Sequence, residues 1–497
     1  MASAGKVRKQ SESPTEHWTD DLPICTQSGV GFSPNQRYRV DGGRREEHEF
    51  EDRSFHFHFE DKDCYLYGVF DGYNGKNAAE FAAQKLPAEL LLGQLTDDMN
   101  DEDIKIVLRQ AIMEVEKGFF DSIGDKLVEK TLIEEEIAGL NQYDAVQQFP
   151  VKVERLRLIE QEIACGTTAV VALIYNNKLF LTNVGNSRAV LCTTDSNGRL
   201  HVQQLSADHI IGNQNELIRL SHLGLDVENI RRGPKFGNHE STRCIGDYTV
   251  KGGYKEFDIL SSATDEPVIA EPDIFGGIPI DDSFYLFVLM SDGLYKSLED
   301  SKVLNQDVNV EIVGLIATEL QAQSTINGVC QAVVDRICRY HHDCFMNENK
   351  LCERRDDMTL LLRLFNAQLG GNTTSPVSPL TNFHPFSGQK NLGFVQFPLP
   401  TNGGILSSSY SAVTDLPYST PGETMPVPSD TTMSFATAPV TSEITQEPFT
   451  GSMADTTTET QKDQADGGFV DCYVDFSEYY KAIEIYGEDY VINSVQL

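Results

Sequence analysis

The sequence predicts an α+β domain in which antiparallel β-sheets are flanked by helices, and three observations lead to this class. Short apolar runs, each about the length of one strand, recur between residues 64 and 365. Patterns with helical periodicity separate some of these runs. Other runs follow one another closely: residues 178–184 and 188–193 are separated by a turn containing Gly185-Asn186, which predicts a β-hairpin. Neighbouring strands of this kind, with long helices elsewhere, favour antiparallel sheets covered by helices.

Each element is assigned from its own pattern. Runs dominated by β-branched, aromatic and other apolar residues are assigned as strands: residues 64–70, 168–175, 178–185, 188–192, 283–290 and 358–365. Three longer segments with apolar residues at helical spacing are assigned as helices: residues 78–95, 101–123 and 327–341. Residues 126–163 are charged and helical in pattern, so we expect a solvent-facing hairpin or excursion there.

The charge of the chain excludes several classes of partner. Its 497 residues include 75 acidic and 40 basic side chains, which gives a formal net charge of −35. Such a surface repels nucleic acid and anionic membranes, so we expect neither as a partner. The N-terminal residues lack the apolar region of a signal peptide, and no run approaches the roughly 18 apolar residues that span a bilayer. We therefore expect a soluble protein without membrane insertion, located in the cytoplasm.

The ten cysteines are scattered, and several lie inside apolar runs, as expected of reduced core residues in a cytosolic protein. One cluster, "CRYHHDC", contains Cys338, His341, His342 and Cys344, which are residue types that bind zinc. Its spacing matches no standard zinc motif. We prefer the interpretation of an irregular helix end.

Changes in composition divide the chain into four parts. Residues 1–19 are polar and are expected to form a flexible N-terminus, and residues 20–366 contain the strands and helices of one folded domain. Residues 367–468 are rich in Ser, Thr and Pro without helical or strand periodicity, so we expect a disordered linker. Residues 469–497 are rich in aromatic residues. An aromatic segment at the end of a tether is typical of a docking motif.

Carboxylates lie beside strands or turns at several places in the predicted domain, namely Glu51-Asp52, Asp71, Asp292 and Asp356. Asp71 and Asp292 each follow an apolar strand and precede a glycine, where a turn exposes the carboxylate and a neighbouring carbonyl. Hard cations such as Mg²⁺ and Mn²⁺ prefer such oxygen ligands. A single residue of this kind is usually a solvated turn residue. The interpretation therefore depends on the group as a whole.

The carboxylates fall within an ordered series of motifs that resembles the protein phosphatase 2C family of metal-dependent serine/threonine phosphatases. The series is "ED" at 51–52, "VFDGYNG" at 69–75, "CGTTAVVALI" at 165–174, "NVGNSRAVL" at 183–191, "SADHIIGNQNELIRLSHLG" at 206–224, "STRCIGDYTVK" at 241–251, "VLMSDGLYKSL" at 288–298 and "DDMTLLL" at 356–362. So many blocks in the family's order make chance similarity negligible. The resemblance implies two packed antiparallel sheets flanked by helices.

The resemblance also implies a role for each carboxylate. Active members hold two Mn²⁺ or Mg²⁺ ions that activate a bridging water for attack on phosphorus. Carried over by position, Asp71 would bridge both ions. The Gly72 carbonyl and Glu51 would bind one of the ions, and Asp52 would hold a water molecule behind these ligands. Asp292 and Asp356 would bind the other ion.

Four departures from the family pattern indicate a degraded site. The arginine that binds phosphate is replaced by Glu47, although Arg44 and Arg45 lie near enough in sequence to take over that role. The proposed proton donor, a histidine, is replaced by Tyr73, whose ordinary pKa near 10 is too high for the task. Two aspartates are replaced by Asn186 and Lys296, and the lysine places a cation where the family coordinates one. These replacements predict a pseudophosphatase that requires no cofactor and binds Mn²⁺ or Mg²⁺ weakly.

Within the family, the chain is similar to a non-catalytic kind of member that activates the transforming-growth-factor-β-activated kinase by binding it. The similarity includes "WTDDLPICTQSGVG" at 18–31 and the terminal "YVDFSEYY" at 473–480. It implies an adaptor that binds this kinase through its C-terminal segment. It also implies a stress-activated MAP kinase and an inhibitor-of-apoptosis protein as further partners. Two alternatives stay open: an active phosphatase with a rearranged site, and a tail that folds back onto its own domain.

The C-terminal segment has the pattern of a short amphipathic helix over residues 471–486. Asp475 is a good N-cap and Glu478 completes a capping box, while Val474 and Tyr479 are placed as a hydrophobic staple. The residues expected to contact the kinase are Tyr473, Val474, Phe476, Tyr479, Tyr480 and Ile483, of which Phe476, Tyr480 and Ile483 form one stripe. A helix this short needs a groove that buries its apolar stripe.

Overall fold

The computed structural model describes residues 18–370, apart from short gaps at 40, 42, 61–62, 92–94, 97–98, 233–235, 237–239, 302–305 and 348–349. Most of the predicted N-terminal segment and linker, and the whole docking segment with all six predicted kinase-contacting residues, therefore lie outside the described residues.

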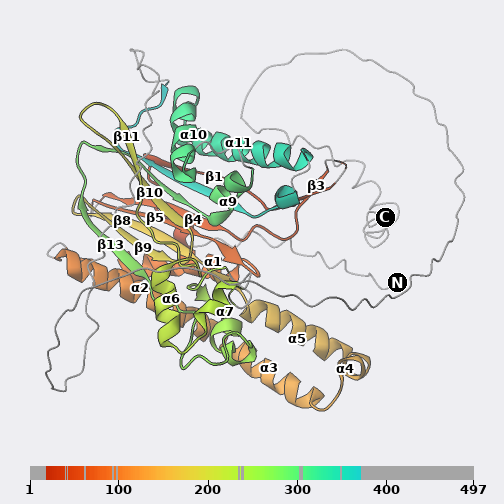
Figure 1. Cartoon of the computed structure of the whole chain (residues 1–497). Coiled ribbons are helices and arrows are strands. Elements are labelled where there is room, and N and C mark those ends of the chain that lie inside the picture. Colours follow the sequence, from red (N-terminus) through yellow and green to blue (C-terminus); the bar gives the residue numbers. More distant parts are fainter. Residues whose placement is uncertain are drawn as a thin grey trace, which may run out of the picture. The chain divides into compact units, whose positions relative to one another are not determined.

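The elements follow one another in mixed order along the chain (Figure 1). The strands are β1 (Ser28–Ser33), β2 (Gln36–Tyr38), β3 (Arg44–Arg45), β4 (Arg53–Phe59), β5 (Cys64–Phe70), β6 (Gly72–Tyr73), β7 (Gly166–Thr167), β8 (Ala169–Tyr175), β9 (Lys178–Val184), β10 (Arg188–Thr194), β11 (Leu200–Gln204), β12 (Ile245–Gly246), β13 (Asp273–Pro279), β14 (Phe284–Met290), β15 (Arg354–Arg355) and β16 (Met358–Leu364). The α-helices are α1 (Asn77–Leu91), α2 (Asp101–Ser122), α3 (Gly124–Ile137), α4 (Gln142–Gln148), α5 (Pro150–Ile163), α6 (Gln214–His222), α7 (Val227–Arg232), α8 (Tyr248–Lys251), α9 (Asp292–Asp300), α10 (Val308–Ala322) and α11 (Ile326–Met346). Short 3₁₀ helices are η1 (Trp18–Asp21), η3 (Tyr254–Glu256) and η4 (Lys350–Glu353).

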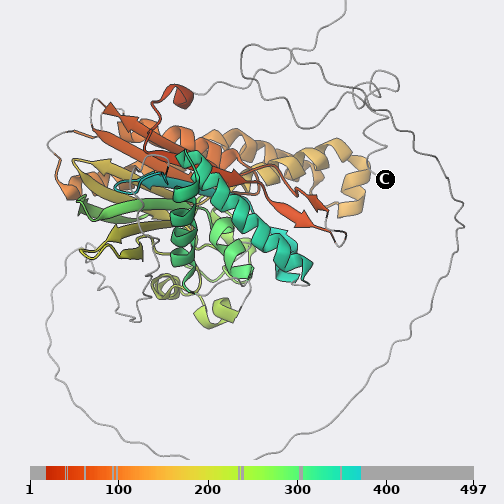
Figure 2. The ribbon, with the colours of Figure 1, turned by 90° about the horizontal axis from the view of Figure 1, so that it is seen from above.

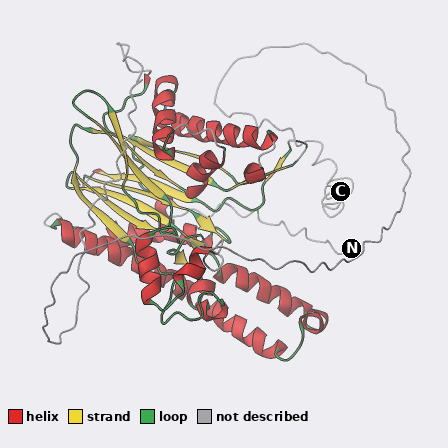
Figure 3. Ribbon diagram, in the orientation of Figure 1, coloured by secondary structure: helices red, strands yellow, loops and turns green. Residues whose placement is uncertain are grey.

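Two five-stranded antiparallel sheets form the centre of the domain, with strand orders β1-β16-β14-β10-β11 and β13-β9-β8-β5-β4. Helices lie on the outer face of each sheet, so the layers run helix, sheet, sheet, helix (Figure 3). The predicted α+β class, two antiparallel sheets flanked by helices, is therefore confirmed. No helix in the described part of the chain is both long and apolar enough to cross a membrane.

Strand β14 shows why these runs are apolar throughout. Its side chains alternate between the two faces of the sheet, as they do in any strand. Leu286 and Val288 face the helices α10 and α11, whereas Phe287 and Leu289 face the second sheet. Because both faces are buried, the sequence of the strand is continuously hydrophobic rather than alternating.

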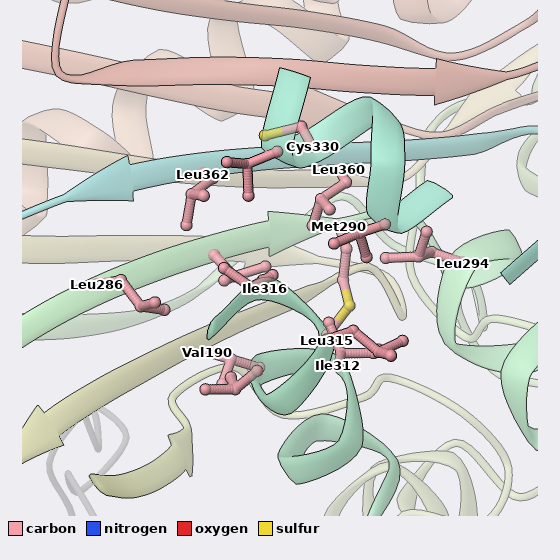
Figure 4. Close-up of a cluster of buried hydrophobic side chains, with 14 of the residues drawn as sticks. Val190, Leu286, Met290, Leu294, Ile312, Leu315, Ile316, Cys330, Leu360 and Leu362 are labelled. Carbon is pink, nitrogen blue, oxygen red and sulfur yellow. The ribbon is translucent and has the colours of Figure 1, made fainter. Parts of the chain in front are cut away.

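The core beside the first sheet is built by α9, α10 and α11. Figure 4 shows Leu294 of α9 and Ile316 of α10 packed against Met290 of β14 and Leu360 of β16. Figure 2 looks onto α10 and α11, which lie over this face of the sheet. On the other side, α1 and α2 cover the second sheet with side chains such as Leu86. The start of α9 is thereby held rigidly at the end of β14, which positions Asp292.

The predicted hairpin between residues 178–184 and 188–193 is wrong. Strand β9 pairs with β8 and β13, whereas β10 pairs with β11 and β14 of the other sheet. The hairpin instead joins β8 to β9 through Asn176 and Asn177, which both have positive φ, of 51° and 54°, as a two-residue hairpin turn requires. Gly185, at φ 107°, instead begins the connection between the two sheets. That connection brings Asn186 to the sheet ends.

Residues 126–163 form the predicted helical hairpin. Helices α3 and α5 pack along each other, with Ile133 and Ile159 buried between charged surfaces. Arg155 of α5 makes a two-point ion pair with Glu129 of α3, with N–O distances of 2.8 and 2.6 Å. Figure 1 shows this pair of helices extending away from the two sheets.

The "CRYHHDC" cluster belongs to the last turns of α11, which continues without interruption to Met346. His341 is fully buried against the ring of Tyr38. Cys344 instead approaches the carbonyl of Asp300, and Cys338 lies beside Met358. The two cysteines are thus directed to neighbours other than the Tyr38 ring that both histidines contact, as expected of a helix packed on a core.

Candidate functional site

A cleft of about 810 Å³ opens where strand ends of the two sheets meet α9. The residues that line it are Glu47, His48, Glu51, Asp71, Gly72, Tyr73, Asn74, Gln161, Thr168, Asn186, Glu240, Ser241, Asp292, Lys296, Arg354 and Asp356. The structure therefore places all the sequence-predicted metal ligands and all four replaced positions around one cleft.

Asp71 lies at the end of β5, and its backbone is fixed by the neighbouring strand. The Asp71 carbonyl accepts hydrogen bonds from the Thr168 amide at 2.9 Å and the Thr167 hydroxyl at 3.0 Å. Burial, followed by the charges of Asp292, Asp52 and Asp356, raises the pKa of the Asp71 carboxyl well above its usual value. The carboxylates of the cleft thus repel one another, and their charge is costly to the fold.

Asp292 begins α9, and its side chain is engaged by two nitrogen donors. The Asn186 amide donates to Asp292 Oδ2 at 2.7 Å, and the Lys296 ammonium donates to the same oxygen at 2.6 Å. Lys296 also contacts Glu240. Burial would lower the pKa of Lys296, but Asp292 and Glu240 together raise it above its ordinary value. The lysine at this replaced position therefore points into the cleft rather than away to solvent.

Asp357 positions Glu51 on the opposite wall. The Asp357 carboxylate accepts hydrogen bonds from the backbone amide of Glu51 at 2.7 Å and from the backbone amide of Asn35 at 2.6 Å. Burial, partly offset by the neighbouring His48, raises the pKa of Glu51 to about 7. Asp52, the next residue after Glu51, is fully buried and accepts a hydrogen bond from the Thr359 hydroxyl at 2.7 Å. Burial also raises the pKa of Asp52 well above its usual value.

Tyr73 does not present its hydroxyl to the carboxylates. The ring packs against a separate hydrophobic cluster that includes Leu220 and Cys244, and the hydroxyl oxygen is buried. A Cβ added at Gly166 would overlap this hydroxyl, so the glycine makes room for the tyrosine. Burial, and then the neighbouring Cys244 and Asp247, raise the pKa of Tyr73 further above 10. The tyrosine is part of the wall of the cleft and is a poor proton donor.

Glu47 lies between two arginines at the rim. Its carboxylate oxygens are 3.6 Å from Arg37 Nη1 and 3.5 Å from Arg354 Nε. Arg44 and Arg45, the substitutes considered for phosphate binding, form the exposed edge strand β3 that pairs with β2.

The residues around Asp292 do not fit the two-cation set that the family resemblance implies. Lys296 and Asn186 both donate to Asp292 Oδ2, so a positively charged side chain already lies against this carboxylate. In the part of the chain that the structure describes, no three His, Cys, Asp or Glu side chains are arranged to hold one metal ion.

Replacing Asp71 by asparagine is expected to stabilise the domain when divalent cations are chelated. The folded state holds a proton on this carboxyl more tightly than the unfolded chain, so the charged group lowers stability at neutral pH. This loss should disappear as the pH falls toward the ordinary carboxyl range. We expect the free energy of unfolding in urea with EDTA to rise by about 1–2 kcal/mol at pH 7.5.

Asp258→Asn, at an exposed position outside the cleft, is the matched control and should change stability by less than about 0.5 kcal/mol. A decrease in the stability of Asp71→Asn relative to this control would show that the Asp71 charge stabilises the cleft.

Several residues of the site were missed by the reasoning from sequence, and four of them are charged or titratable. His48, Glu240 and Arg354 line the cleft, and Asp357 holds Glu51 in place. His48 and Arg354 each lie within three residues of a predicted ligand, which was the available signal. Glu240 directly precedes the block at 241–251, but its distance from Asp292 in sequence gave no indication that the two would meet.

The chain is similar to several known proteins. The family model described as "Protein phosphatase 2C" matches residues 36–343. A Caenorhabditis elegans protein, the TGF-beta-activated kinase 1 and MAP3K7-binding protein 1, is 27% identical over 358 residues, covering 69% of this chain and 82% of that protein. Protein phosphatase 2C 1 of Paramecium tetraurelia is 29% identical over 256 residues, covering 50% of this chain and 71% of that protein.

Solved structures match more distantly. A C. elegans sex-determining protein aligns with a TM-score of 0.43 and 16% identity, covering 69% of this chain and 65% of that chain. The serine-threonine phosphatase 2C from Toxoplasma gondii aligns with a TM-score of 0.42 and 16% identity, covering 69% of this chain and 97% of that chain. The family model matches more than half of the chain, including the cleft residues from Glu47 to Lys296, so this chain belongs to the protein phosphatase 2C family.

Proposed function

We propose that this chain is a non-catalytic member of its family, an adaptor that binds and activates a transforming-growth-factor-β-activated MAP kinase kinase kinase. Its C-terminal segment, residues 469–497, would bind the kinase, and the phosphatase-like domain would recruit further partners in the cytoplasm.

The observation that carries the loss of catalysis is the environment of Glu47. A phosphate dianion needs cationic donors, best supplied by an arginine that binds two of its oxygens. Here a carboxylate occupies that position, within ion-pair distance of both Arg37 and Arg354, and its negative charge repels a phosphate dianion. The proton donor is also lost, because the hydroxyl of Tyr73 is buried in the wall of the cleft. Substrate binding and protonation of the leaving group are thus impaired together.

The kinase part of the proposal has two supports. The C. elegans relative is described as a binding protein of TGF-beta-activated kinase 1, and this chain covers 82% of it. The sequence of residues 473–483 also has the aromatic stripe of a docking helix. The same relative makes a MAP kinase cascade the natural setting for this adaptor.

The purified full chain is expected to show no turnover of an aryl phosphate or a phosphopeptide in excess Mn²⁺. The physical reason is the combined effect of Glu47 and Tyr73, since general acid catalysis alone is worth roughly 10²–10⁴ in rate. The measurement is phosphate release beside an active member of the family at equal concentration. Mn²⁺-dependent turnover comparable to the active enzyme, and abolished by Asp71→Asn, would contradict the proposal.

A second candidate function, an active phosphatase with a rearranged site, is favoured by two residues of the cleft. His48 lies 3.6 Å from Glu51 through its Nδ1 atom. Burial lowers its pKa, but the Glu49 carbonyl and the Glu51 charge outweigh this effect, so the pKa of His48 is raised and suits a proton donor. Arg354 could contact phosphate if Glu47 moved away. Turnover that is lost in His48→Gln and increased in Glu47→Ala would support this function instead.

A further inference from the structure

We propose that Lys296 is a built-in cation that takes the place of a divalent metal ion at Asp292 and keeps this half of the cleft closed to metals. The inference depends on the family's cleft and on the contacts of Lys296, and it does not depend on kinase binding.

The first argument is that two donors converge on one oxygen of Asp292. A carboxylate that binds a metal must direct an oxygen lone pair to the ion. Asp292 Oδ2 instead accepts the Lys296 ammonium at 2.6 Å and the Asn186 amide at 2.7 Å. Both donors are at positions that the family resemblance marks as replaced. The two replaced residues therefore contact the same oxygen atom. Two unrelated replacements would not be expected to converge in this way.

The second argument is that the lysine is fixed in this position. Lys296 and Asp292 are four residues apart on α9, so the helix itself brings the two side chains together. Asn186 is 3% exposed, and its backbone carbonyl accepts a hydrogen bond from the Tyr295 hydroxyl at 3.0 Å. The amide is thereby held beside Asp292. The fold therefore holds both donors, Lys296 and Asn186, next to the Asp292 carboxylate.

The third argument is the second carboxylate on Lys296. The ammonium also contacts Glu240, which comes from a segment 56 residues away in sequence. One positive charge thus joins two acidic groups from different segments, the arrangement a metal ion would otherwise provide. A divalent ion entering beside Asp292 would face the repulsion of the fixed ammonium. The fold consequently tolerates its acidic cleft without a cation at this position.

The test is calorimetric titration of Mn²⁺ into the full chain and its Lys296→Met variant. We expect the variant to bind Mn²⁺ at least tenfold more tightly than the parent protein, because the fixed positive charge beside Asp292 is then removed. The matched control is Lys178→Met, since Lys178 is equally exposed, at 37% against 35%, and pairs with Asp101 outside the cleft. This control should bind Mn²⁺ as the parent does.

Two further variants separate the mechanism from a general loss of structure. Lys296→Gln keeps a hydrogen-bond donor but removes the charge, and it should also gain Mn²⁺ affinity. Asp292→Asn combined with Lys296→Met should lose the gain. In a folded variant the gain should also appear as a larger rise of melting temperature with Mn²⁺ than the parent shows.

Equal Mn²⁺ affinity in the parent, Lys296→Met and Lys296→Gln would overturn the inference, as would tight binding of two ions by the parent protein. None of these results bears on kinase binding, which the same variants should retain. Loss of kinase binding in Phe476→Ala would in turn leave the inference unaffected.

Discussion

Phe476→Ala is expected to weaken binding of the full chain to the kinase by roughly 100-fold or more, about 3 kcal/mol. Phe476 is the first residue of the stripe that continues with Tyr480 and Ile483 on one face of the predicted helix. Central aromatic residues contribute most of the binding energy where a short helix lies in a groove. The measurement is the dissociation constant from calorimetry or interferometry with the purified kinase, and Tyr480→Ala should show a similar loss.

Ser477→Ala and Lys481→Ala are the matched controls, because these residues lie away from the apolar stripe on the same predicted helix. Both should bind within about threefold of the parent protein, and the melting temperature of the phosphatase-like domain should be unchanged in all four variants. Unchanged affinity in Phe476→Ala and Tyr480→Ala would show that the docking assignment is wrong.

Lys251→Met is expected to lower the free energy of unfolding of the domain by about 3–5 kcal/mol. Lys251 is 1% exposed, contacts the Glu116 carboxylate, and donates to the Cys244 carbonyl at 2.8 Å. The other oxygen of Glu116 accepts the Gly246 amide at 2.7 Å. Removing the lysine leaves a carboxylate charge buried without its counter-ion, which is the costly case for a buried pair. Urea unfolding monitored by circular dichroism measures the loss.

Two variants give this prediction its controls. Lys130→Met, which removes an exposed pair with Glu134 on α3, should cost no more than about 1 kcal/mol. Lys251→Met combined with Glu116→Gln should be less destabilised than Lys251→Met alone, because the uncompensated charge is removed. If the double variant were as unstable as the single one, lost packing rather than the unpaired charge would be the cause.

The fold class could be predicted from the sequence because the strands are buried on both faces. Continuous apolar runs such as residues 284–290 mark strands between two layers, and this signal is local. The hairpin was predicted wrongly for a local reason as well. Gly185-Asn186 has the composition of a tight turn, but the pairing of β9 and β10 is decided by their neighbours in two different sheets.

The sequence predicted which residues belong to the candidate site, but it did not predict their contacts. The ordered motifs identified Asp71, Asp292 and Lys296, and the structure places all three on one cleft. The sequence does not show whether the Lys296 side chain points toward the cleft or toward solvent. The contact with Glu240 decides between them, and it joins residues 56 positions apart.

The sequence by itself determined the layered α+β class, the family, and which positions of the family's site had been replaced, since each depends on residue type and local order. Only the tertiary structure decided what the replacements do. It buries the hydroxyl of Tyr73, pairs Glu47 with Arg37 and Arg354, and directs Lys296 to Asp292. The physical reason is that the charge, burial and hydrogen bonding of a side chain depend on neighbours that the fold brings from distant parts of the chain.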